Sequence, residues 1–421
     1  MKSKSILQLD GRTGEGGGQL VRLACALAAV TAQPIRIINV RGNRPGARGG
    51  GLKSQHVTSI AWLAQATGAE VKGLEVGSHT LEFRPNALPT ALQQRKIQIV
   101  AGSPAASTLL IFQAIFPYLL FASNEGGDPI EAEIQGGTNV SFSLSYEYLD
   151  QVLLPTLQAR FGILVERKLE KRAWSQGSSS KGVIRLKIQP LPRGESLKLS
   201  HPWDRPITAE DFKVKHIDAS ILAPLALHES LEKALVRDLD SLFPDVDVNF
   251  KVIEDSGHPA RMYTLLVVHS ETGLRWGRDF LYDRKAKNKT PENLSDEISR
   301  KVCKDLFEEI SKRGVVDEFL QDQLVVFQVL AQGRTSFPRG PEPVDIGNQG
   351  ESVTDPNDMS DTLEELDLVP TKRMRRDKTH EPFGYGSTHT TTARWVASEL
   401  LPTVQWFNKG SICDGAGMSF S

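Results

Sequence analysis

The sequence lacks the long hydrophobic runs and the cysteine pattern that would mark two large classes of protein. Its longest apolar stretch, Leu109 to Ala122, is too short to span a bilayer and contains Gln113 and Pro117. The three cysteines are odd in number, far apart and without metal-site spacing, which excludes a disulfide scaffold or a zinc ribbon and favours a reducing compartment. No signal-peptide core follows Met1, so we expect the chain not to be secreted.

The chain also has no excess of charge of either sign. Its 50 basic and 51 acidic residues give a net charge of −1, which by itself argues against a generic nucleic-acid binder. The charges are nevertheless segregated, because residues 1–56 hold nine basic and two acidic residues, whereas Glu351 to Asp367 holds seven acidic and no basic ones. The N-terminal segment, with a local charge of +7, is therefore where a polyanion would bind.

The order of elements predicts an α/β or α+β fold. With 421 residues and 39% hydrophobic residues, the chain is long enough for two or three domains. Strand-like runs alternate with helical patterns such as 19–31 and 54–67. Prolines near residue 190 and a polar stretch at 285–290 bound a block with one helix, at about 223–242, and three strands.

These boundaries predict a small α/β domain at 193–287, inserted into a large domain formed by 1–192 and 288–421. Residues 350–383 combine high charge with few apolar residues, which predicts a disordered insertion. The basic cluster at 372–376 within it is either a nuclear localisation signal or a counter-charge to the acidic run beside it.

A glycine-rich turn, Gly14-Glu15-Gly16-Gly17-Gly18-Gln19, connects the first predicted strand to the first predicted helix. Glycines let a backbone approach a ligand closely, and a helix N-terminus favours an anion, so a phosphate group suits this position. Neither the P-loop nor the dinucleotide fingerprint fits, since Gln19 stands where the last glycine of the latter belongs. A plain tight turn remains an equal alternative.

Three arginines could converge beside this turn. Arg22 lies in the first helix, and Arg41 and Arg44 follow the second predicted strand. If that strand end lies next to the helix start, three guanidinium groups would meet, as phosphate recognition requires. Scattered surface arginines are the alternative. Gln55 and His56 begin the next helix, where a lone histidine is more often a capping or packed residue than a functional one.

Two further groups come from the C-terminal third. His389 precedes the helical stretch 393–401, and a helix N-terminus favours the neutral, nucleophilic imidazole. Incidental placement in a Ser/Thr capping run is an equal alternative. Asp322 and Gln323 project away from an apolar helical stripe, so Asp322 either faces solvent or has a polar partner.

Taken together, these motifs resemble the RNA 3′-terminal phosphate cyclase family. The resemblance is carried by residues 9–22, 40–46, 55–56, 101–103, 136–139 and 316–324, and it extends over about 5–190 and 290–407. It implies a large domain of repeated β-α-β-α-β-β units with a small inserted domain. It also implies an activity: ATP-dependent conversion of an RNA 3′-phosphate end to a 2′,3′-cyclic phosphate through a covalent histidine–AMP intermediate.

The resemblance assigns roles residue by residue, with ATP and RNA 3′-phosphate ends as the partners. His389 would be the nucleophile. The nucleotide site would contain Glu15, Gln113, Phe319, Asp322 and Gln323. The phosphates and the RNA end would contact Arg22, Arg41, Arg44, Gln55 and His56. Mg²⁺, or Mn²⁺, would bridge ATP oxygens, with Glu15 or Asp322 as a possible ligand.

Some positions depart from the family pattern. The loops at 45–53 and 173–182 differ from it, and Phe319 stands where a tyrosine is common. Two other functions compete with the cyclase: a non-catalytic cyclase-like factor in ribosomal RNA processing, which lacks the nucleophilic histidine, and a plain RNA-end-binding module, which does not need His389. In a eukaryote the resemblance implies a nuclear location, in nucleoplasm or nucleolus, and otherwise a cytoplasmic one.

Overall fold

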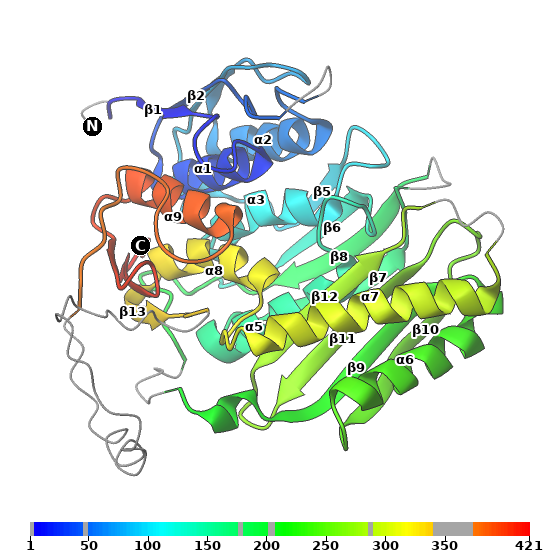
Figure 1. Cartoon of the computed structure of the whole chain (residues 1–421). Coiled ribbons are helices and arrows are strands. Elements are labelled where there is room, and N and C mark those ends of the chain that lie inside the picture. The colour runs from blue at the N-terminus through cyan, green and yellow to red at the C-terminus, as the bar shows by residue number, and fades with distance from the viewer. Residues whose placement is uncertain (1–3, 45–48, 176–179, 201–206, 285–288, 340–373) are drawn as a thin grey trace, which may run out of the picture.

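The computed structural model describes residues 4–44, 49–175, 180–200, 207–284, 289–339 and 374–421 (Figure 1). Of the predicted disordered insertion at 350–383, residues 350–373 lie outside these ranges. Residues 374–383 are instead held against the fold, because the Asp377 carboxylate accepts hydrogen bonds from the N–H groups of Lys409 (2.9 Å) and Gly410 (2.7 Å). The expected disorder therefore does not extend to this end of the segment.

Two four-stranded sheets have the same strand order and the same strand directions. The first has the order β1-β2-β4-β3 and the second β5-β6-β8-β7; in each, the first pair is parallel and the other two are antiparallel. The strands are β1 (Leu7–Asp10), β2 (Ile35–Ile38), β3 (Glu70–Lys72), β4 (Leu81–Arg84), β5 (Lys96–Val100), β6 (Ile130–Gly136), β7 (Val165–Lys171) and β8 (Gly182–Ile188). This repetition confirms the predicted α/β fold class.

Helices from both ends of the chain pack between the sheets. They are α1 (Gly18–Thr31), α2 (Ser54–Thr67), α3 (Thr108–Leu120), α8 (Glu318–Leu330) and α9 (Thr388–Leu400). Helix α1 contacts α2, α3 and α9, so the C-terminal helix lies beside the first one (Figure 1). Its apolar stripe and its alanines are both buried, which makes α1 the centre of the core. A helical stretch of three parts leads to β7: α4 (Tyr146–Tyr148), a π-helical turn (Leu149–Leu153) and α5 (Leu154–Phe161).

A third, smaller sheet has the order β13-β15-β14 and was not predicted. Its strands are β13 (Gln332–Ser336), β14 (Gln405–Phe407) and β15 (Ile412–Ala416). The three cysteines, all within the described ranges, are buried and form no disulfide.

The fourth sheet, β10-β9-β11-β12, belongs to a separate unit that is covered by two helices. Its elements are β9 (Val214–Ala223), α6 (His228–Leu242), β10 (Asp247–Asp255), β11 (Tyr263–Ser270), β12 (Arg275–Leu281) and α7 (Pro291–Ser311). Helix α7 packs on α6, β11 and β12. The packed unit therefore continues to residue 311, past the predicted boundary at 287, and β9 occupies residues where no strand was predicted.

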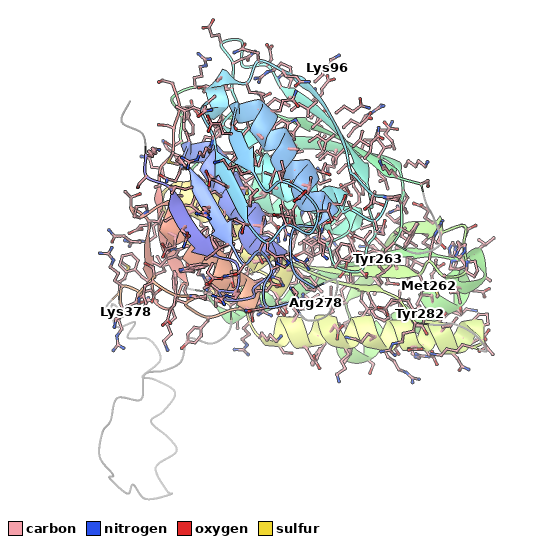
Figure 2. The ribbon with its side chains drawn as sticks, turned by 90° about the horizontal axis from the view of Figure 1, so that it is seen from above. Lys96, Met262, Tyr263, Arg278, Tyr282 and Lys378 are labelled. Atoms are coloured by element: carbon pink, nitrogen blue, oxygen red, sulfur yellow. The ribbon has the colours of Figure 1, made fainter. Side chains whose placement is uncertain are left out.

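Buried hydrogen bonds join this unit to the larger one. Tyr263 and Arg278, labelled in Figure 2, extend from β11 and β12. The Tyr263 hydroxyl bonds to Ser145 and donates to Asp279, at 3.0 Å, and Arg278 forms ion pairs with Glu309 and Glu318. Among the described helices, none is both long and apolar enough to cross a bilayer.

Candidate active site

The glycine-rich turn brings the start of α1 against the start of α2. Gly17 is the N-cap residue and offers no side chain to the first amide groups of α1. At Gly18 a Cβ atom would lie 2.6 Å from His56 Nε2 and 3.0 Å from an Arg22 nitrogen. Only glycine therefore lets the backbone of this helix N-terminus share one space with those two side chains.

His56 is held as a neutral hydrogen-bond donor. Its Nδ1 accepts the Lys53 N–H at 3.1 Å, so in the neutral ring the proton is on Nε2. Burial lowers the pKa of His56 well below its ordinary value, and the charges of Arg22, Arg41 and Lys53 lower it further. Nε2 is buried and has no hydrogen-bond partner among the described residues. An acceptor oxygen of a ligand would satisfy it.

The three predicted arginines surround the same space. Burial lowers the pKa of Arg22 to about 10, which leaves it charged at neutral pH. Arg41 contributes to that lowering, so the two guanidinium groups are close enough to repel each other. Arg41 itself sits at a φ of 55°, an unusual backbone for a residue with a side chain, and donates to the Gly51 carbonyl at 3.2 Å. Asp322 opposes the lowering at Arg22, but the concentrated positive charge still makes this space a site for an anion.

Glu15 provides the acidic group of the pocket lining. It forms an ion pair with Arg44, and its carboxylate lies over Gly17. Its backbone N–H donates to Thr392 Oγ1 at 2.8 Å, which ties the glycine-rich turn to α9. Apart from the ion pair, both buried carboxylate oxygens accept no hydrogen bond from the described residues.

His389 is the second residue of α9, so this helix begins before the predicted position of 393. Ser387 caps the helix, its hydroxyl accepting the Thr390 N–H at 3.2 Å. Partial burial lowers the pKa of His389; Asp322 opposes this, and the charges of Arg22 and Arg44 add to the lowering. The imidazole is therefore neutral at neutral pH, the form in which a ring nitrogen has a free lone pair.

Asp322 is connected to the pocket through Gln19. Its Oδ2 accepts the Gln19 Nε2 hydrogen at 2.7 Å, and its Oδ1 accepts from Gln323 at 2.9 Å. Burial raises the pKa of Asp322, while His389 and these two hydrogen bonds act in the opposite direction. An acidic group thus lies within electrostatic range of His389, with both of its oxygens already hydrogen-bonded.

Most of the predicted site residues line one cavity of about 450 Å³. The lining includes seven of the predicted site residues: Glu15, Arg22, Arg41, Arg44, Gln55, His56 and His389. The cavity contains the N-termini of α1 and α2, three arginines and two histidines, His56 and His389, and its lining includes Phe142, which is 56% exposed. A polyphosphate or a nucleic-acid terminus matches this combination of size, charge and donors.

Comparison with known proteins agrees with this geometry. The model of the family described as RNA 3′-terminal phosphate cyclase matches residues 13–344. The chain belongs to this family. It is 32% identical over 338 residues to the RNA 3′-terminal phosphate cyclase of Pyrococcus furiosus, covering 78% of this chain and 87% of that protein. It is 28% identical over 352 residues to the protein of the same name from Drosophila melanogaster, covering 81% and 88%. The predicted family is thereby confirmed.

Four predicted residues of the cyclase site lie outside the cavity lining: Asp322 and Gln323, described above, and Gln113 and Phe319. Gln113 is half-buried on α3, one turn beyond Leu110, which does line the cavity. Phe319 packs edge-on against Tyr148, with ring centroids 6.2 Å apart, and under the Arg278 guanidinium at 4.4 Å. The assignment of all four residues to the nucleotide site stays a prediction.

Sequence reasoning overlooked three residues that shape the cyclase-family pocket. Gln19 links Asp322 to the cavity, Lys53 fixes the tautomer of His56, and Thr392 anchors the glycine-rich turn. Gln19 could have been found, because it lies three residues before Arg22 and therefore on the same face of the helix. Thr392 could not, since its partner Glu15 is 377 positions away.

Proposed function

We propose that this chain converts an RNA 3′-phosphate end to a 2′,3′-cyclic phosphate, with ATP as the energy source and His389 as the nucleophile. The observation that carries the proposal is the position of His389. A neutral imidazole at the start of α9 shares one cavity with three arginines and the open N-terminus of α1. The name of the relatives supports the same reaction.

In the first step, an imidazole nitrogen of His389 attacks the α-phosphorus of ATP. A nitrogen–phosphorus bond forms, the bond to the bridging oxygen breaks, and pyrophosphate leaves with the electron pair. The second ring nitrogen then loses its proton. The raised pKa of Asp322 suits a role in receiving or relaying that proton. Two helix N-termini and Arg22, Arg41 and Arg44 would stabilise the charge that builds up on the phosphoryl oxygens.

In the second step, an oxygen of the RNA 3′-phosphate attacks the same phosphorus and displaces His389, which leaves a 3′-linked adenylate. The 2′-hydroxyl then attacks the RNA phosphorus, loses its proton and releases AMP. His56 has the geometry for holding the terminal phosphate, because its Nε2–H faces the cavity without a protein acceptor among the described residues. Gln55, beside it, also lines the cavity.

A divalent cation such as Mg²⁺ fits one of the two predicted ligands better than the other. The Glu15 oxygens are buried and accept no hydrogen bond from the described residues, whereas both Asp322 oxygens are already bonded to glutamine amides. Glu15, after separation from Arg44, is therefore the candidate ligand, with Gln19 Oε1 also lacking a partner in the same part of the structure. When bound, such an ion would neutralise charge on the phosphate oxygens.

The proposal is tested by incubating the protein with α-labelled ATP and Mg²⁺, and then with an RNA oligomer that ends in a 3′-phosphate. We expect an acid-labile AMP adduct and a cyclised end, and loss of both in His389→Ala. His380→Ala is the matched control, because this histidine is nine positions away and its side chain is 70% exposed. A protein that cyclises nothing and forms no adduct would be the non-catalytic alternative. An adduct without cyclisation would point to another nucleotidyl transfer.

A further inference from the structure

A second cluster of chemically reactive side chains lies on the sheet of the smaller unit, far from the cavity. His216 and Asp218 are two residues apart on β9, so their side chains extend from the same face of the sheet. His269 on the antiparallel strand β11 is the register partner of His216. Three side chains from two adjacent strands therefore meet at one point of the sheet.

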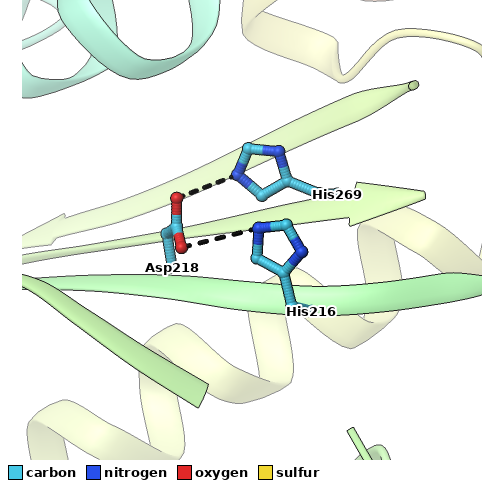
Figure 3. A group of neighbouring side chains, drawn as sticks. All are labelled: His216, Asp218 and His269. Atoms are coloured by element: carbon cyan, nitrogen blue, oxygen red, sulfur yellow. Dashed lines mark hydrogen bonds and ion pairs between the residues drawn. The ribbon is translucent and has the colours of Figure 1, made fainter. Parts of the chain in front are cut away.

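Both imidazoles face one carboxylate (Figure 3). His269 Nε2 lies 3.1 Å from Asp218 Oδ2, and His216 Nε2 lies 3.7 Å from Asp218 Oδ1. The rings are stacked, with centroids 4.3 Å apart and planes inclined by 12°. One donor atom of each residue lies within 4.8 Å of the other two. Among the described residues, this is the one group of three such ligands.

We propose that His216, Asp218 and His269 bind a divalent transition-metal ion of the zinc class. Two imidazole nitrogens and one carboxylate oxygen form a set that Zn²⁺ accepts and that Mg²⁺ or Ca²⁺ does not favour. Metal–ligand bonds of about 2.1 Å require the donor atoms to approach to roughly 3.4 Å of each other. Since the present separations are at most 4.8 Å, a movement of each side chain by about 1 Å would bring the donor atoms to that distance.

A metal ion at this site would compete with the ammonium group of Lys251 for Asp218. Lys251, from β10, places its ammonium group 3.4 Å from Asp218 Oδ2, and Asn249 donates to Oδ1 at 3.4 Å. The Asp218 side chain is only 10% exposed, whereas that of Lys251 is 51% exposed. The lysine can therefore move into solvent without unpacking the sheet, and the metal ion would replace it as the counter-charge of the buried carboxylate.

Partial burial lowers the pKa of His269, one of the three residues, to about 4, although Asp218 opposes that shift. The site also differs from the proposed catalytic one in every residue. In Figure 1 the strands β9 and β11 lie in the part of the molecule remote from α1 and α9. Metal binding here is therefore independent of the cyclase proposal.

The test uses the untagged full chain, stripped of metal with a chelator and then titrated with Co²⁺ and Zn²⁺. We expect one equivalent of Co²⁺ to produce the intense visible absorption of a four- or five-coordinate centre, and Zn²⁺ to displace it. His269→Ala and Asp218→Asn should weaken binding at least tenfold, whereas His380→Ala should leave it unchanged. Excess Mg²⁺ should not compete.

Lys251→Met keeps the length of the side chain and removes the competing charge, so it should tighten binding severalfold. A variant that failed to fold would lose affinity, so tighter binding cannot result from misfolding. The proposal is overturned if His269→Ala, shown to be folded by its circular dichroism, binds like the unmodified chain. It is equally overturned if Lys251→Met does not tighten binding, or if binding is lost in His389→Ala or Glu15→Gln instead.

Discussion

His389 and His56 line one cavity, but the structure prepares them for different tasks. The Nδ1 of His56 is occupied by a backbone amide, so this ring can only donate from Nε2, whereas His389 lies at a helix N-terminus. Both pKa values are lowered by burial and by arginines. The first ring is thereby suited to binding a phosphate oxygen, and the second to attacking phosphorus.

The acid limb of the adenylylation rate tests the electrostatics around His389. Because burial and the nearby arginines hold the pKa of this imidazole below its ordinary value, the ring stays neutral, and the rate is maintained, to a lower pH than for a free histidine. Arg44→Gln removes one of the charges that oppose the imidazolium, so the pKa should rise and the rate should fall off at a higher pH. Arg36→Gln, an equal charge change on the exposed face of β2, should leave the profile in place. An unchanged profile in Arg44→Gln would contradict the account.

The donor role of His56 predicts a specific pattern of rescue. His56→Ala should lower kcat/KM for RNA cyclisation by about 10- to 100-fold, the value of one hydrogen bond to a charged group. His56→Gln can place an amide N–H near the position of Nε2 and should recover part of that loss. Equal rates in the alanine and glutamine variants, measured with protein of matched melting temperature, would mean that His56 is merely structural.

Helices α1 and α2 can approach each other closely because residue 18 is a glycine, which has only a hydrogen atom in place of a side chain. Gly18→Ala puts a methyl group 2.6 Å from His56 Nε2. Alanine is otherwise favourable in a helix, so unfolding in urea should change by no more than about 1 kcal/mol. Adenylylation should fall by roughly 100-fold, because displacement of the ring and of Arg22 misplaces the phosphate. A fully active Gly18→Ala enzyme would contradict the assigned close contact.

The cap of α8 joins three elements. Asp317 accepts hydrogen bonds from the Leu320 N–H, from Tyr148 (2.6 Å) and from the Gly277 N–H (2.8 Å). Asp317→Ala leaves these buried donors unpaired and should reduce the free energy of unfolding by about 3–5 kcal/mol. Glu308→Ala, which removes an exposed carboxylate on α7, should cost less than about 1 kcal/mol. Urea unfolding that cannot distinguish the two variants would count against the role of Asp317.

Elements whose apolar residues repeat regularly could be predicted from the sequence. Elements that form only by pairing with strands far away along the chain could not. Helix α2 was predicted with the bounds it has, because its apolar positions repeat along one face. Strand β9 was not predicted, although its buried Ile217 and Ile221 alternate with polar residues, because the apolar spacing from 223 onward favours a helix. The sheet of β13, β14 and β15 gives only short signals, and its strands pair across gaps of up to 84 positions, as between Gln332 and Ala416. The same holds for the candidate site. Its residue types could be predicted from the sequence, but the hydrogen bond between Gln19 and Asp322 could not.

At the scale of the whole molecule, a net charge of −1 conceals a concentrated cationic cavity. Three arginines and Lys53 line that cavity, so about three or four phosphate contacts are expected at an RNA end. Binding of a 3′-phosphorylated oligomer should then weaken with salt with a slope of about −2 to −3 in log K against log salt. Fluorescence anisotropy measures this slope, and a 3′-hydroxyl oligomer should bind more weakly. A much steeper slope would indicate a broad basic surface in place of a terminal site.

The central claim is that His389 carries AMP during turnover, and peptide mass spectrometry with fragmentation tests it most directly. The full chain, incubated with ATP and Mg²⁺ and digested at alkaline pH, should yield one adenylylated peptide with AMP on the imidazole of His389. His389→Ala should yield none, while His380→Ala should match the unmodified chain. AMP located on any other residue, or cyclisation that persists in His389→Ala, would contradict the account.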